Sequence, residues 1–231
     1  MCPGVPYHVT QRGNRREKVF FSDYDRQTYL DYLKQYTGQF AIDVIAYSLM
    51  GNHVHLIIVP STQHGLQRAL RPLHMRHAQR INRTRSWHGH VWQGRYFSSA
   101  LDDAYLWTAI RYVELNPVRA GLTARAEDYP WSSAAAHCSL RPDPVLTTNP
   151  FWNDLLQGVG DWSAWLAAGE PTRNFQELRR HTFKGLPCGS PAFVERLERA
   201  TGRQLQLRPQ GRPRRPREQN IEKGLRPLFE D

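Results

Sequence analysis

Two histidines flank a single apolar residue at the start of an aliphatic run. His53 and His55 lie on either side of Val54 and are followed by Leu56–Pro60. Such a run is typical of a buried strand, and successive strand side chains point to opposite faces. His53 and His55 are therefore expected to share one face, where two imidazoles on a rigid strand can hold one divalent cation.

A second pair with the same spacing is expected to differ. His88 and His90 flank Gly89 in a stretch that reads as a turn. Because glycine favours turns over strands, we do not expect this pair to form a fixed metal site. Context rather than spacing separates the two pairs.

Tyr112 and Asn116 lie one helical turn apart, about sixty residues after the histidines. Residues four apart share a helix face. A phenol with a pKa of about 10 is a poor nucleophile at neutral pH. A cation held by His53, His55 and the Asn116 amide oxygen can polarise a phosphodiester and neutralise charge in its transition state. Both Mg²⁺ and Mn²⁺ suit this donor set, and attack by Tyr112 would leave a phosphotyrosine that conserves the energy of the broken bond.

Each of these residues also has a plain structural reading. Tyr112 alone is more often a core aromatic, Asn116 a helix-end residue before Pro117, and the two histidines hydrogen-bonded side chains on a sheet. The combination of all four on a basic chain favours a metal-assisted tyrosine nucleophile.

The elements that must position these side chains follow from periodicity and helix-capping signals. We expect strands over 7–11, 40–50, 53–59 and 91–101, and helices from 22 or 23 to about 38, over 66–83, and from 102 or 103 to about 116. Pro72 should kink or delay the second helix. The first six elements predict an α+β, ferredoxin-like split βαβ domain with an antiparallel sheet, and the added helix with Tyr112 can cross the open sheet face.

The chain divides by composition into three parts. Residues 1–137 are expected to form the catalytic domain, 138–207 a mainly helical C-terminal extension, and 208–231 a basic, disordered tail. Seven arginines and no acidic residue lie between Arg199 and Arg217.

Charge points to a polyanionic partner. The formal net charge is +10, and no Asp or Glu occurs between Asp43 and Asp102. An acid-free, arginine-rich segment is typical of a phosphate-facing surface. Three scattered cysteines, no apolar signal segment and no spanning run predict a cytoplasmic, nucleoid-associated protein without membrane attachment.

Four blocks of sequence resemble the single-tyrosine HUH transposases. They are Pro3–Asn14, Met50–His55, Trp92–Tyr96 and Tyr112–Leu122. The REP-associated tyrosine transposases, relatives of the IS200/IS605 enzymes, are the branch most similar to residues 3–137. Trp131–Ser133 and the Gly-Arg-Pro tail also resemble that branch.

The resemblance implies that Tyr112 is the nucleophile and that His53 and His55 are metal ligands, with Asn116 at the position of the third ligand. It implies cleavage of single-stranded DNA beside a REP-like hairpin, a 5′-phosphotyrosine intermediate and rejoining of strands. A monomer is implied for this branch, with a homodimer as the alternative. Any longer N-terminal arm of relatives is expected to be missing.

The expected DNA contacts are polar and mostly basic. Arg111 and Arg119 flank the nucleophile and are expected to clamp phosphate, and the tail reads equally as a minor-groove hook or as an electrostatic tether. The full set is Arg12, Asn14, Arg76, Arg80, Arg83, Arg95, Arg111, Arg119, Arg212 and Arg214.

Three other functions remain open from the sequence. An RNA-binding module would share the fold but needs exposed aromatics on the central strands, and His53–Val59 has none. A nuclease using metal-bound water would not need Tyr112. A non-catalytic DNA-binding protein of transposase descent would need neither metal nor tyrosine.

Overall fold

The computed structural model describes residues 1–169 and 171–206. The predicted tail from 208, with Arg212 and Arg214, lies outside the described residues. The strands are β1 (Tyr7–Arg12), β2 (Ile42–Met50), β3 (His53–Pro60) and β4 (Phe97–Ala100). The helices up to the middle of the chain are η1 (Asn14–Arg16), α1 (Asp23–Gln39), α2 (Gly65–Arg85), α3 (Asp103–Glu114), α4 (Asn116–Arg119), η2 (Ala126–Asp128) and α5 (Ala134–His137). The later helices are α6 (Pro150–Gln157), α7 (Trp162–Ala167), α8 (Thr172–Lys184) and α9 (Pro191–Thr201).

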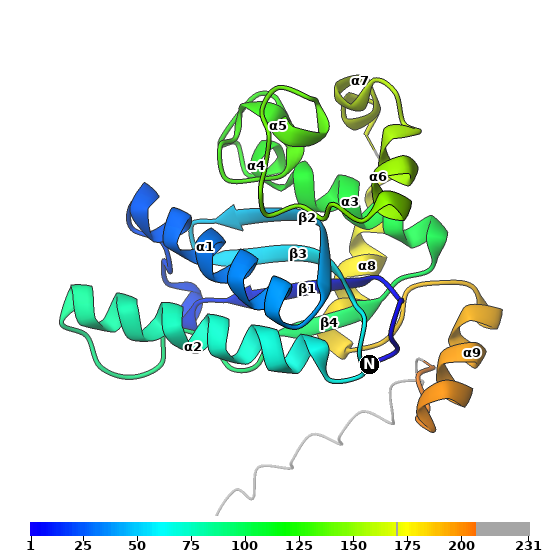
Figure 1. Cartoon of the computed structure of the whole chain (residues 1–231), viewed down its shortest axis with the longest axis horizontal. Helices are drawn as coiled ribbons and strands as arrows, with labels where there is room; N and C mark the ends of the chain where they lie inside the picture. Colours follow the sequence, from blue (N-terminus) through cyan, green and yellow to red (C-terminus); the bar gives the residue numbers. More distant parts are fainter. Residues whose placement is uncertain (170, 207–231) are drawn as a thin grey trace, which may run out of the picture.

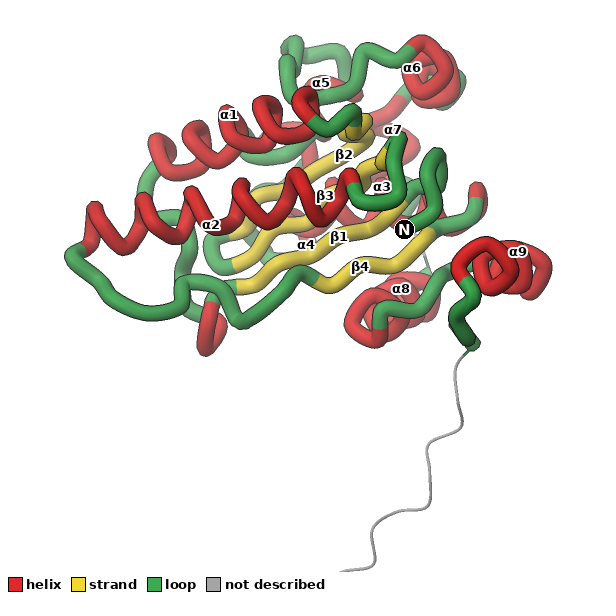
Figure 2. Tube along the Cα trace, turned by 60° about the horizontal axis from the view of Figure 1, so that its bottom comes forward, coloured by secondary structure: helices red, strands yellow, loops and turns green. Residues whose placement is uncertain are grey.

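The four strands form one antiparallel sheet in the order β2-β3-β1-β4. This is the ferredoxin-like order, so the predicted fold class is confirmed. Helices α1 and α2 lie side by side on one face (Figures 1 and 2), whereas α3 and α8 pack against the other face. The face that an RNA-binding module would leave open is therefore covered.

Alternation along β3 divides the core into two layers. Val54, Leu56 and Ile58 are buried beneath α1 and α2, whereas Ile57 and Val59 are buried against α3. His53 and His55 have the same parity as Ile57 and Val59, so their side chains point toward the α3 face. The predicted shared face of the two histidines is what the structure shows.

Two expected elements differ from the structure. The fourth strand covers only Phe97–Ala100, because β4 pairs with Tyr7–Thr10 and the preceding residues leave the ladder. Trp92 instead turns inward and donates its indole N–H to the carbonyl of His74 at 2.9 Å. Helix α2 begins at Gly65 and continues through Pro72, so the proline does not delay it.

The C-terminal extension shares the core of the preceding α+β domain. Trp162 and Leu166 of α7 and Phe175 and Leu178 of α8 are buried in the same cluster as Ile110 of α3. Helix α3, which carries Tyr112, is therefore packed between the sheet and the extension. No helix in the described part of the chain combines the length and hydropathy that crossing a bilayer requires.

A fully buried carboxyl group joins α3 to this extension. Glu114 accepts hydrogen bonds from Ser133 Oγ at 2.5 Å, His137 Nδ1 at 2.6 Å and Trp162 Nε1 at 2.7 Å. We expect Glu114→Ala to lower the free energy of unfolding by about 3–5 kcal/mol, because it leaves three buried donors without an acceptor. Urea unfolding measures the loss, and Glu195→Ala, at an exposed position of α9, is the matched control. A loss of less than about 1 kcal/mol would contradict this role.

Candidate active site

The two histidines of β3 lie together at the start of the strand. The centroids of the His53 and His55 rings are 4.9 Å apart and the rings are nearly perpendicular. His55 is 4% exposed, whereas His53 is half-buried. The exposed pair His88 and His90 lies in the loop after α2, as expected, with Gly89 at a φ of 94°.

Both histidines are held in the neutral form. Burial, together with the charges of Arg12 and Arg179, lowers the pKa of His53 to about 4. Burial also lowers the pKa of His55 well below its usual value, with His53, His8 and two arginines acting in the same direction. A neutral imidazole is the form that binds a metal ion.

Each histidine has one nitrogen engaged and one exposed to the site. His53 Nδ1 bonds Asn52 Oδ1 at 2.6 Å, and His55 Nδ1 bonds His8 Nε2 at 2.9 Å. Among the described residues no hydrogen bond engages Nε2 of either histidine, and both atoms retain some solvent-accessible surface. Both Nε2 atoms therefore face solvent on the same side of the sheet.

Tyr112 of α3 lies against these rings. Its ring centroid is 5.4 Å from that of His55, 5.7 Å from that of His8 and 5.4 Å from that of Phe175. The residue is only 5% exposed. Within the described residues its hydroxyl makes no hydrogen bond, and the oxygen retains some solvent-accessible surface. The ring is thus packed while the hydroxyl reaches solvent beside the histidines.

Asn116 begins α4, directly after the end of α3. Leu115 separates the two helices, and Pro117 follows Asn116 in the first turn of α4. Asn116 is half-buried, and its side chain makes no hydrogen bond within the described residues. The structure therefore leaves its amide available one helical turn beyond Tyr112.

Arginines surround the tyrosine and the histidines. The guanidinium of Arg119 lies 4.8 Å from the centroid of the Tyr112 ring. Arg12 pairs in register with His53, and its pKa is lowered by burial and by the charges of Arg16 and Arg179, although Tyr112 opposes the shift. Arg111, the other predicted clamp, lies instead 4.1 Å over the ring of Trp165.

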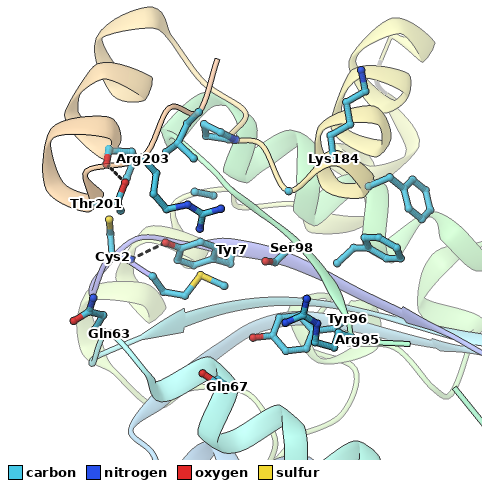
Figure 3. A pocket seen from close by; sticks show the side chains of 18 of the residues that line it. Cys2, Tyr7, Gln63, Gln67, Arg95, Tyr96, Ser98, Lys184, Thr201 and Arg203 are labelled. Atoms are coloured by element: carbon cyan, nitrogen blue, oxygen red, sulfur yellow. Dashed lines mark hydrogen bonds between the residues drawn. The ribbon is translucent and has the colours of Figure 1, made fainter. Parts of the chain in front are cut away.

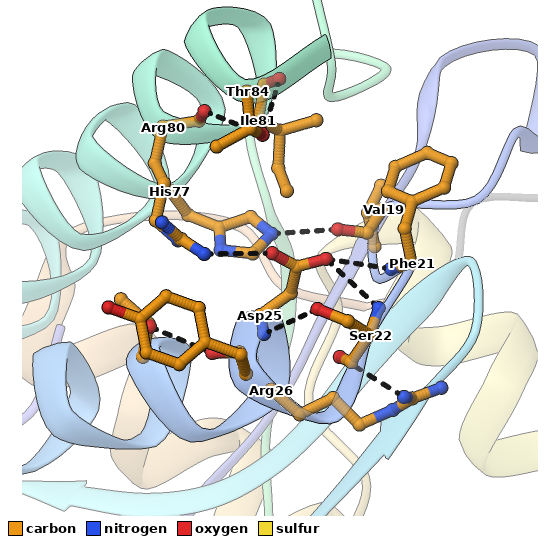
Figure 4. A network of polar contacts seen from close by, with 11 residues as sticks. Val19, Phe21, Ser22, Asp25, Arg26, His77, Arg80, Ile81 and Thr84 are labelled. Carbon is orange, nitrogen blue, oxygen red and sulfur yellow. Dashed lines mark hydrogen bonds and ion pairs between the residues drawn. The ribbon is translucent and has the colours of Figure 1, made fainter.

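The remaining predicted DNA contacts on α2 lie on the other face of the sheet, whereas Asn14 follows Gly13, which donates to the carbonyl of Asn52 beside His53. Arg76 and Arg83 are exposed on α2, whereas Arg80 pairs with buried Asp25 at 3.1 Å. Figure 4 shows this ion pair beside the Asp25 bonds that hold the start of α1. Asn14 is exposed in η1.

Arg95 lies at a cavity of about 1060 Å³ beside β4 (Figure 3). Tyr7 and Ser98 line this cavity, and Tyr7 belongs to the core layer under α1 and α2. The cavity therefore lies at the β4 edge of the sheet, where Gln67 of α2, Phe183 of α8 and Leu197 of α9 also line it.

The two imidazoles of β3 are the donors that the structure brings together at the candidate centre. The described residues contain no cluster of three or more His, Cys, Asp or Glu side chains that could hold a metal. Two imidazoles with an amide oxygen as third ligand would leave coordination positions open, unlike a closed structural zinc site, and do not by themselves identify the metal.

Four residues of the site were not predicted from the sequence. His8 of β1 bonds His55, and Phe175, Arg179 and Thr182 come from α8. The residues at 175, 179 and 182 share a helix face by their spacing. That spacing is visible in the sequence, but nothing local connects this face to Tyr112.

Comparisons with known proteins place this fold in a family. A family model described as "Transposase IS200 like" matches residues 3–116, which include β1–β4, α3 and all four predicted catalytic positions. Over these residues the chain belongs to the IS200-like transposase family. The family predicted from the sequence is confirmed, and its members are DNA-processing transposases.

Two solved structures are similar to this transposase. One is the REP-associated tyrosine transposase bound to a REP hairpin, with 18% identity, a TM-score of 0.52, and coverage of 64% of this chain and 87% of that chain. The other is a Deinococcus radiodurans protein described as a candidate transposase, with 19% identity, a TM-score of 0.37, and coverage of 49% and 92%. A comparison with curated proteins finds no match. At these identities the first structure supports the fold.

Proposed function

We propose that this transposase is a metal-dependent, single-strand DNA endonuclease and strand transferase with Tyr112 as its nucleophile. One observation carries the proposal: the Tyr112 ring lies 5.4 Å from that of His55, which lies 4.9 Å from that of His53. The Tyr112 ring and the two imidazoles thus form one contiguous cluster on the α3 side of the sheet. The substrate is DNA that forms a REP-like hairpin, the ligand named for the similar solved structure.

The reaction is a transesterification. The Tyr112 oxygen attacks phosphorus, the bond from phosphorus to the 3′ oxygen breaks, and the phenol proton is lost to solvent while the leaving oxygen gains one. The products are a 5′-phosphotyrosine and a free 3′ hydroxyl, and reversal with another 3′ hydroxyl rejoins strands. Because a phosphodiester bond replaces a phosphodiester bond, no nucleotide hydrolysis is needed.

The residues of the site have separate roles. His53, His55 and Asn116 would hold the cation, which supplies Lewis-acid polarisation of the scissile phosphate when it is bound. Arg12 and Arg119 are placed to attract the phosphate and stabilise its developing charge. Phe175 and His8 pack against the Tyr112 ring and restrict its rotation.

The direct test uses a labelled single-stranded hairpin with Mg²⁺ or Mn²⁺. A 3′-end label should remain on the protein in an SDS-resistant band, and a 5′-end label should appear on a shorter released strand with a 3′ hydroxyl. Labels that exchange these positions would overturn the 5′-phosphotyrosine assignment. Binding of the hairpin without cleavage in either metal would favour a non-catalytic DNA-binding protein.

Arg179 of α8 should contribute to DNA binding although it lies in the extension. It is exposed, and its charge acts on both His53 and Arg12. We expect Arg179→Ala to weaken hairpin binding and to reduce the slope of log affinity against log salt by about 0.7, the value for one single-strand phosphate contact. Fluorescence anisotropy over a salt series measures both. Arg173→Ala, at an exposed position in the first turn of α8, should change the slope less, and equal slopes would contradict the assignment.

A further inference from the structure

A chain of hydrogen bonds connects α8 to the inner metal-site histidine. Thr182 Oγ1 lies 2.8 Å from the carbonyl of Leu178 and 2.8 Å from His8 Nδ1. His8 Nε2 then lies 2.9 Å from His55 Nδ1. The His8 and His55 rings are within 13° of parallel with their centroids 5.1 Å apart, which is compatible with an N–H···N bond lying in the plane of both rings. All three side chains are buried.

The Leu178 carbonyl sets the direction of every hydrogen bond in this series. The Leu178 carbonyl can only accept, so the single hydroxyl proton of Thr182 lies on that bond. Thr182 must therefore accept from His8, which places the His8 proton on Nδ1. The buried, neutral His8 then has only a lone pair at Nε2, so His55 must donate from Nδ1.

The direction matters because it determines what His55 offers the site. An imidazole with its proton on Nδ1 has a lone pair on Nε2, the nitrogen that faces solvent beside His53 and Tyr112. His53 also carries its proton on Nδ1, where it donates to a different partner. Asn52 donates Nδ2–H to the carbonyl of Arg16 at 3.0 Å, which turns its Oδ1 toward His53 Nδ1 at 2.6 Å. Both histidines thus carry their lone pair on Nε2, and their ring centroids are 4.9 Å apart.

We propose that His8 and Thr182 are positioning residues that hold His55 in its Nδ1–H form, so that α8 of the extension prepares the metal site. The proposal rests on the function proposed above for His53 and His55. It adds that the catalytic domain is incomplete without α8. If Thr182 cannot accept a hydrogen bond, His8 is free to carry its proton on Nε2 and the chain can reverse, which would put a proton on His55 Nε2 and block ligation.

The first test reads the proton positions in the metal-free, full-length protein. Nitrogen-15 NMR of labelled histidines at neutral pH distinguishes the two tautomers. We expect His8 and His55 both to carry Nδ1–H in the wild type, and His55 to shift toward Nε2–H in Thr182→Val. Thr182→Ser, which keeps the hydroxyl, should retain the wild-type pattern.

A matched control separates the Thr182–His8–His55 hydrogen bonds from the general effect of removing a buried helix hydroxyl. Thr37 of α1 is also buried and also donates to the carbonyl four residues earlier, at 2.8 Å, without a histidine partner. Thr37→Val should leave the His55 tautomer unchanged. A wild-type spectrum with the proton on His55 Nε2 overturns the proposal, whatever the variants do, and so does an unchanged His55 in folded Thr182→Val.

The second test measures Mn²⁺ binding without DNA, by electron paramagnetic resonance of the free ion. Thr182→Val and His8→Phe should each bind Mn²⁺ about tenfold more weakly than the wild type, whereas Thr182→Ser and Thr37→Val should match it. Equal affinity in all variants would overturn the proposal. The tautomer and Mn²⁺ results do not depend on cleavage. The positioning role of His8 and Thr182 can therefore be confirmed even if no protein–DNA adduct forms. An adduct can equally form when both of these measurements contradict the positioning role.

Discussion

Tyr112→Phe should abolish the covalent protein–DNA adduct and reduce cleavage of a hairpin substrate by about three orders of magnitude or more. The substitution removes only the attacking oxygen, because the phenyl ring can keep its contacts with His55, His8 and Phe175. Hairpin affinity and thermal stability should stay near the wild-type values. Denaturing gels of a labelled hairpin, together with anisotropy and thermal unfolding, measure these quantities.

Tyr105→Phe is the matched control for this substitution. Tyr105 lies on the same helix and donates its hydroxyl to Glu177 at 2.7 Å, away from the histidines. Its loss should leave adduct formation intact. If Tyr112→Phe instead cleaves at the wild-type rate and no adduct forms in either protein, the enzyme uses water as the nucleophile and the role proposed for Tyr112 is wrong.

His53→Ala should reduce cleavage by about 100-fold or more while largely preserving hairpin binding. The change removes one of the two imidazole ligands, and a bound cation contributes several kcal/mol to stabilising transition-state charge. His53 is half-buried, and its hydrogen bond goes to a side chain of the adjacent residue, so folding should survive. Mn²⁺ titration should show weaker binding in parallel with the loss of cleavage.

The second histidine pair supplies the control for this variant. His88→Ala removes an exposed imidazole with the same sequence spacing, and it should change neither Mn²⁺ affinity nor cleavage. If His53→Ala loses hairpin binding as well as cleavage but remains folded, His53 contacts the DNA rather than the cation. Equal Mn²⁺ affinity of wild type and His53→Ala would exclude it as a ligand.

Local patterns in the sequence were sufficient for the fold and for part of the site. The aliphatic run after His53 predicts a buried strand, and period-two alternation then requires both histidines to face one way. The Asp102 cap and Pro117 bracket the helix that carries Tyr112, and the structure places α3 between them. These rules act within a few residues, so no partner element is needed to apply them.

Contacts between distant segments decided the rest. Arg111 and Arg119 look equivalent around Tyr112 in the sequence, but packing of α7 places Trp165 beneath Arg111 and leaves only Arg119 over the tyrosine ring. Arg80 likewise pairs with Asp25, which lies fifty-five residues earlier. Neither outcome can be read from helical spacing, because the partner belongs to another element.

The sequence by itself predicted which residues could carry the chemistry, and it determined that His53 and His55 share a strand face. Only the tertiary structure decided that α8 of the extension closes over the site and brings Thr182 to His8, which lies 174 positions away in the chain. The physical reason is that side-chain direction follows from local backbone geometry, whereas the orientation of a buried imidazole depends on whichever donor or acceptor the folded chain packs against it.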